Sequence, residues 1–101
     1  MDYIFPATVF SQTNTLDEQF DHVLSEVAEV EELGPELYAM VGNLSGWEEK
    51  HRELELEILD LIHSLETWRR ILVNERGQEY VEGLVREIVA KNSAPERAYY
   101  L

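Results

Sequence analysis

The sequence has no cysteine and little glycine, proline or positive charge. Without cysteine it forms neither disulfide bonds nor thiolate metal sites, which is typical of proteins in a reducing compartment, so we expect a cytoplasmic protein. Five glycines and three prolines among 101 residues fall below the average of about 12% for the two together, which favours long helices. No apolar run approaches the roughly 20 residues that a membrane-spanning helix needs.

Positive charge is scarce: eight Lys and Arg stand against 21 Asp and Glu, and the formal net charge is −13. Proteins that bind the phosphate backbone of DNA or RNA draw their affinity from Lys and Arg, and anionic membrane surfaces attract the same residues. We therefore expect binding to neither nucleic acids nor membranes. Eight bases also cannot pair with 21 acids, so many carboxylates must be solvated or held by another cation.

Apolar residues recur with helical spacing in three segments, 15–34, 47–73 and 75–91. Thr15 and Glu18 form a capping box at the start of the first segment. Gly34 and Pro35 predict that the first helix ends at these residues and that a short helix follows over 36–41. The second segment carries an apolar seam with alternating spacings of four and three, formed by Leu54, Ile58, Leu61, Leu65, Trp68 and Leu72.

These patterns predict an all-α fold, an antiparallel helical bundle of three main helices plus a short one. A single domain covers residues 1–101, with an N-terminal arm over 1–14 and a C-terminal tail over 92–101. Three amphipathic helices in so short a chain leave an apolar face uncovered. We therefore expect oligomerisation to complete the bundle, as a homodimer or a dimer of dimers.

Two pairs of acidic residues border the apolar stripes. Glu26 and Glu29 lie three residues apart in the first long helix, and Glu57 and Asp60 have the same spacing in the second. Each pair projects from neighbouring positions on its helix, and antiparallel packing would bring the pairs together. Four clustered carboxylates do not all stay ionised unless a cation neutralises them. Oxygen ligands favour Mg²⁺ or Mn²⁺, and such sites usually bind polyphosphates.

The two acidic motifs, separated by 27 residues, resemble the ExxE…ExxD pattern of the MazG-like all-α nucleoside triphosphate pyrophosphohydrolases. Residues 19–26 are similar to the segment that leads into the family's first motif, in which a glutamine commonly precedes the first metal ligand by seven residues. Glu57 to Ile62 is similar to the second motif, and the basic and aromatic end of the chain is similar to the family's closing segment. The first motif departs from many members, because Ser25 stands where a second glutamate is common.

The resemblance implies hydrolysis of a nucleoside or deoxynucleoside triphosphate to the monophosphate and pyrophosphate. Glu26, Glu29, Glu57 and Asp60 would hold Mg²⁺ or Mn²⁺, with Glu29 as general base. The candidates for binding the substrate phosphates are Lys91, Asn92 and Arg97. Those for recognising the base are polar residues in or near the first helix, Gln12, Asn14, Gln19 and His22, although His22 is also placed to contact Glu26.

Two other functions remain open at this point. A phosphoribosyl-ATP pyrophosphohydrolase-like enzyme would use a similar chain length and similar motifs. A non-catalytic acidic helical protein, acting as an interaction module or a nucleic-acid mimic, would also suit a net charge of −13. A mimic needs its acids spread over the outer surface, whereas the two acidic pairs border the apolar stripes. Lys91 and Asn92 equally suit the end of a helix without any ligand.

Overall fold

The computed structural model describes residues 2–39, 42 and 44–101. These residues form helices and no strand, so the predicted all-α class is confirmed. The helices are α1 (Phe10–Thr13), α2 (Leu16–Ala39), α3 (Leu44–Arg76) and α4 (Gln78–Ser93). The chain divides into two compact units, Met1–Ile71 and Leu72–Leu101. None of the helices in the described part is both long and apolar enough to cross a membrane.

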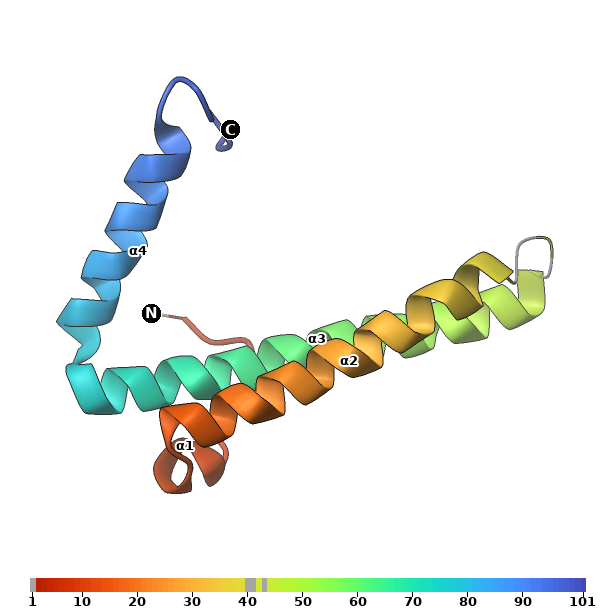
Figure 1. Cartoon of the computed structure of the whole chain (residues 1–101), viewed down its shortest axis with the longest axis horizontal. Coiled ribbons are helices and arrows are strands. Elements are labelled where there is room, and N and C mark those ends of the chain that lie inside the picture. Colours follow the sequence, from red (N-terminus) through yellow and green to blue (C-terminus); the bar gives the residue numbers. More distant parts are fainter. Residues whose placement is uncertain (1, 40–41, 43) are drawn as a thin grey trace. The chain divides into compact units, whose positions relative to one another are not determined.

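Helices α2 and α3 lie side by side and run in opposite directions (Figure 1). Gln19, near the start of α2, donates hydrogen bonds to Ser64 in the second half of α3. Glu36, near the end of α2, forms a 3.1 Å ion pair with Lys50, near the start of α3. Residue numbers therefore rise along one helix as they fall along the other, and the antiparallel arrangement of these two helices is as predicted.

The start of α2 is as predicted, but its end is not. The Thr15 backbone N–H donates to Glu18 Oε1 over 2.9 Å, and the Glu18 N–H donates to Thr15 Oγ1 over 3.1 Å, which completes the capping box. The helix then continues through Gly34 and Pro35 to Ala39. Proline removes one helical hydrogen bond, and the ion pair of Glu36 with Lys50 joins the turn after Pro35 to α3. The separate helix predicted over 36–41 is thus wrong for 36–39, while Met40 and Val41 lie outside the described residues.

The boundaries of α3 and α4 also differ from those predicted. Helix α3 runs from Leu44 to Arg76, past both predicted ends at 47 and 73. Gly77 separates it from α4 with a φ of 92°, a value that glycine adopts without a steric penalty. Helix α4 then extends to Ser93, two residues beyond the predicted 91. Residues 92 and 93, the first two of the predicted tail, are therefore helical, and the non-helical part begins at residue 94.

Several of the buried side chains of α2 and α3 are polar. On α2 the buried positions are Gln19, Val23 and Glu26, and on α3 they include Ser64, Thr67 and Ile71. Extending the α3 series toward the N-terminus with the same alternation of three and four residues leads to Asp60 and Glu57. The acidic motifs therefore belong to the face along which the two helices meet.

This arrangement leaves much of the apolar surface uncovered. Ile58 and Leu65, two members of the apolar seam predicted on α3, are 41% and 47% exposed. On α2, Phe20 is 51% and Leu24 is 50% exposed. The apolar seam is thus only partly covered within the chain, because part of the neighbouring polar face of α3 meets α2.

Candidate functional site

Three carboxylates come together in the middle of the α2–α3 interface. One oxygen from each of Glu26, Glu57 and Asp60 lies within 4.8 Å of the other two. Glu26 is buried, Glu57 is half-buried and Asp60 is exposed, so the cluster opens from the interface toward solvent. The i, i+3 spacing places Glu57 and Asp60 on one face of α3, and the antiparallel pairing sets Glu26 opposite them. We call these three residues the carboxylate cluster.

The surroundings of the cluster disfavour full ionisation. Burial, followed by the negative charges of Asp60 and Glu29, raises the pKa of Glu26 from 4.5 to about 7. The pKa of Glu57 is also raised, first because a protonated Glu57 shares a hydrogen bond with Glu29, then because of partial burial and the neighbouring acids. At neutral pH a proton or a cation must therefore offset part of the negative charge.

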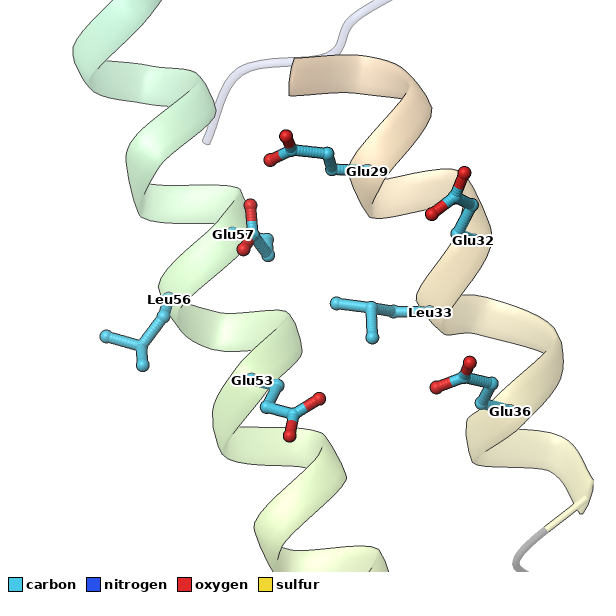
Figure 2. Close-up of a pocket in the computed structure, with 7 residues that line it drawn as sticks. All are labelled: Glu29, Glu32, Leu33, Glu36, Glu53, Leu56 and Glu57. Atoms are coloured by element: carbon cyan, nitrogen blue, oxygen red, sulfur yellow. The ribbon is translucent and has the colours of Figure 1, made fainter. Parts of the chain in front are cut away.

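Glu29, the fourth acid of the two motifs, lies beside the cluster and is exposed. Figure 2 shows its carboxylate reaching from α2 toward α3 next to Glu57. Both side chains line a pocket of about 280 Å³ between the helices. Five of its seven lining residues are glutamates, and the full set is Glu29, Glu32, Leu33, Glu36, Glu53, Leu56 and Glu57.

The positive charge near this pocket is held at its far end. Lys50 Nζ lies 3.1 Å from Glu36 and 3.2 Å from Glu53, and these two contacts raise the pKa of Lys50. The described residues include every Lys and Arg of the chain, and no Lys or Arg forms an ion pair with Glu26, Glu29, Glu57 or Asp60. The interpretation of these acids as members of ordinary surface ion pairs therefore does not apply.

Two residues predicted to recognise the base lie next to the cluster. His22 Nε2 is 3.4 Å from Glu26 Oε1, one helical turn away, which is the contact anticipated from the spacing. Gln19 is 2% exposed, and its amide nitrogen donates to the backbone oxygen and the hydroxyl of Ser64 over 3.0 and 3.1 Å. Its carbonyl oxygen accepts a 2.9 Å hydrogen bond from Asn14. Gln19 thus joins α2 to α3, with both ends of its amide occupied by protein partners.

The residues predicted to bind phosphate belong to the second unit, whereas the carboxylate cluster belongs to the first. Lys91 is exposed in the last turn of α4. Arg97 donates a long hydrogen bond of 3.5 Å to Asn92 Oδ1, and Tyr99 N–H donates to the Asn92 backbone oxygen over 2.9 Å. Asn92 therefore holds the tail against the end of α4, and the phosphate-binding role of these residues remains a prediction.

Sequence reasoning missed a set of contacts on the other side of the cluster. Glu66 is buried at 9% exposure because its carboxylate accepts two backbone hydrogen bonds from the N-terminal arm. His63 lines a pocket together with Asp60 and Glu26. The three-and-four spacing of Glu57, Asp60, Ser64 and Thr67 was a usable signal for the polar face of α3. No local pattern indicated that the arm returns to Glu66.

Comparison with known proteins identifies no relative: no family model, no curated protein and no solved structure matches this chain.

Proposed function

We propose that this protein is a Mg²⁺- or Mn²⁺-dependent nucleotide pyrophosphohydrolase of the MazG-like type, which hydrolyses a nucleoside or deoxynucleoside triphosphate to the monophosphate and pyrophosphate. The observation that carries the proposal is the convergence of Glu26, Glu57 and Asp60 from two helices, with oxygens within 4.8 Å of one another. Carboxylates gathered at a helix interface without a Lys or Arg partner are suited to binding a hard divalent cation.

The residues present fit such a cation. Twice the roughly 2.1 Å Mg–O distance gives about 4.2 Å between opposite ligands of an octahedral ion, so oxygens within 4.8 Å need only small rotations to share one. Glu26 Oε2 and Glu57 Oε2 are buried and have no hydrogen-bond partner among the described residues. Buried carboxylate oxygens normally accept a hydrogen bond or bind a cation, which favours Glu26, Glu57 and Asp60 as the ligands.

When bound, a divalent cation supplies charge neutralisation for phosphate oxygens and lowers the pKa of a coordinated water. The chain contributes the proton acceptor. Glu29 lies outside the group of three oxygens, is exposed, and adjoins Glu57. A carboxylate that lies beside the ligands but outside their group is suited to accept the proton of the attacking water, so Glu29 is our candidate general base.

The C-terminal basic residues have a distinct role in this proposal. Lys91 offers a point charge and Arg97 a planar fork for phosphate oxygens, and Asn92 already contacts Arg97. The cluster itself is too acidic to bind a triphosphate unaided. A bound cation would offset the charge of the cluster toward the polyphosphate.

The direct test is metal-dependent release of pyrophosphate. We expect turnover of at least one of the eight common ribo- and deoxyribonucleoside triphosphates, dUTP or phosphoribosyl-ATP with Mg²⁺ or Mn²⁺, and its loss with EDTA. The assay with phosphoribosyl-ATP distinguishes a phosphoribosyl-ATP pyrophosphohydrolase-like enzyme from a general nucleotide pyrophosphohydrolase. Absence of metal-dependent turnover with every substrate, for a protein that retains its helical circular dichroism, would overturn the proposal.

We further propose that two copies associate through the uncovered apolar surface. Phe20 and Val23 of α2 and Leu65 and Trp68 of α3 line an entirely apolar pocket of about 240 Å³. Phe20 and Leu65 are about half exposed, at 51% and 47%. Contact with a second chain would bury this surface and complete a bundle of helices as a homodimer, which could pair again into a dimer of dimers.

A further inference from the structure

Within the N-terminal arm predicted over 1–14, residues 10–13 form α1. Residues 2–9, to which we restrict the name from here on, are bound to α3 through their backbone. Glu66 Oε2 accepts the N–H of Ile4 over 2.7 Å, and Oε1 accepts the N–H of Phe5 over 2.9 Å. Arg70 Nη2 in turn donates to the Phe5 carbonyl over 2.8 Å. One carboxylate and one guanidinium of α3 thus satisfy three backbone polar groups of Ile4 and Phe5, and they fix the path of the arm beside the helix.

Side chains of the arm add to this attachment. The ring of Tyr3 lies against two guanidinium groups. Its centroid is 3.9 Å from Cζ of Arg69 and 3.8 Å from Cζ of Arg70. Phe5 stacks on His63 with ring centroids 4.6 Å apart and planes inclined by 23°. His63 is three residues from Asp60, so the arm approaches the carboxylate cluster along α3.

The arm then closes a pocket beside the cluster. The pocket has a volume of about 270 Å³ and is lined by one residue of the arm, one of α1 and seven of α2 and α3: Thr8, Phe10, Gln19, His22, Glu26, Asp60, His63, Ser64 and Thr67. Two of these, Glu26 and Asp60, belong to the cluster. Ligand pockets usually measure roughly 300 to 1,000 Å³, so this one suits a single small ring system.

Two polar atoms at this pocket lack partners. Thr8 Oγ1 and His63 Nε2 are buried, and within the described part of the chain neither has a hydrogen-bond partner. Buried polar atoms are normally hydrogen-bonded, and both of these residues line the pocket. The hydroxyl can donate and accept, and the imidazole nitrogen does one or the other according to its tautomer.

The remaining wall residues restrict what the pocket accepts. It contains no Lys or Arg, and its two carboxylates disfavour an anion. Phe10 supplies an aromatic surface, and the amide of Gln19 is already occupied by Asn14 and Ser64. A neutral, planar ring with its own donors and acceptors suits these walls, whereas a phosphate group does not.

We propose that the N-terminal arm is a specificity element that closes a binding pocket for the base of the nucleotide, a neutral planar nitrogen heterocycle, with Thr8 and His63 as its hydrogen-bonding contacts. This inference rests on the proposed function for the identity of the ligand. It places the base on the arm side of Asp60 and leaves the phosphates to the cation that the carboxylate cluster would hold. The arm thereby selects among triphosphates that the cluster treats alike.

The test uses the full chain without metal, so that it is independent of hydrolysis. Adenosine, guanosine, cytidine, uridine and thymidine are titrated in EDTA, and binding is followed by amide chemical shifts in two-dimensional NMR. We expect a preferred nucleoside to shift the amides of Thr8, Phe10 and His63. The variants Thr8→Val and His63→Phe keep shape and ring stacking but remove the polar atoms, and each should weaken binding about tenfold, the effect of one hydrogen bond.

Matched controls carry the same chemical changes away from the pocket. Thr13→Val removes a hydroxyl that bonds to the Val9 carbonyl, and His51→Phe replaces a histidine beside Glu55; both should leave nucleoside binding unchanged. The inference is overturned if no nucleoside shifts these amides, or if Thr8→Val and His63→Phe bind like the parent. Nucleoside binding without triphosphate turnover would instead overturn the proposed hydrolase activity, whereas the proposed base-binding pocket would stand.

Discussion

Glu26 on α2 and Glu57 on α3 bring carboxylate oxygens within 4.8 Å of each other across the helix interface, although 30 residues separate them in the sequence. Both also approach Asp60, and the pKa of each glutamate is raised. Two like charges at a helix interface oppose the pairing of the helices unless a proton or a cation offsets them.

Replacing Glu57 with glutamine should separate metal binding from folding. The Glu57→Gln variant keeps the shape of the side chain but loses its charge, so we expect Mg²⁺ affinity to fall by about tenfold or more. Turnover should be lost while the metal-free protein becomes more stable. Isothermal titration with Mg²⁺ and thermal unfolding in EDTA measure the two effects.

The matched control for that variant is Glu55→Gln, on the same helix. Glu55 is exposed and contacts His51 over 3.3 Å rather than the cluster. The Glu55→Gln variant should change neither Mg²⁺ affinity nor turnover. Equal loss of affinity in both variants would indicate that Mg²⁺ responds to the net charge of the chain, and Glu57 would not be a ligand.

The metal-free protein should become less stable as the pH rises from about 4.5 to 7. Glu26 has a pKa of about 7 in the folded chain and 4.5 as its ordinary value, so the folded state binds more protons than the unfolded state in this interval. Melting temperatures in EDTA at pH 5.5 and pH 8 should differ in that direction. The variant Glu26→Gln should reduce the difference, and an unchanged difference would assign the pH dependence to other groups.

Mg²⁺ should stabilise the protein more at pH 8 than at pH 5.5. At the lower pH a proton occupies Glu26, and the cation must displace it, whereas at the higher pH the carboxylate is already ionised. The rise in melting temperature with saturating Mg²⁺ at each pH measures this. A larger rise at pH 5.5 would contradict the role of Glu26 as a ligand.

Glu66→Gln should release the N-terminal arm. Burial alone would raise the pKa of Glu66, but the N–H groups of Ile4 and Phe5, with the nearby arginines, lower it overall. In a glutamine, an NH2 group replaces one of the two oxygens and cannot accept the N–H that the oxygen accepted, so we expect a loss of about 1 to 3 kcal/mol. Urea unfolding and faster amide exchange at Ile4 and Phe5 measure the change.

The same contact predicts an acid transition of the arm. Because the pKa of Glu66 is lowered on folding, its contribution to stability is complete above the ordinary 4.5 and is lost as the pH falls through the lower folded value. In the parent protein the exchange of the two arm amides should therefore become less protected below pH 4.5. The exposed Glu75 provides the control, because Glu75→Gln should leave arm protection unchanged.

Assembly should depend on the apolar pocket shared by α2 and α3. Leu65→Lys places a charge among Phe20, Val23 and Trp68, and we expect it to convert a dimer or a larger assembly into monomers. Light scattering after size exclusion measures the mass. Leu101→Lys, at a fully exposed tail position, is the control and should keep the parent mass. A parent protein that is monomeric throughout would contradict the proposal.

The sequence by itself determined the features that depend on neighbouring residues. The capping box of Thr15 and Glu18 fixes the start of α2 through hydrogen bonds between residues three apart. The spacing of Glu57 and Asp60 fixes their common face because helical geometry repeats every 3.6 residues. The all-α class follows from the same periodicity.

Only the tertiary structure decided which faces meet. The periodicity marks both an apolar stripe and a polar face on α3, and the hydrogen bonds of Gln19 to Ser64 place part of the polar face against α2. Helix α2 passes Pro35 where local propensity predicts an end, and an ion pair with α3 joins the two helices beyond it. The arm reaches Glu66 across more than 60 residues. Such contacts depend on the three-dimensional path of the chain, which local spacing does not encode.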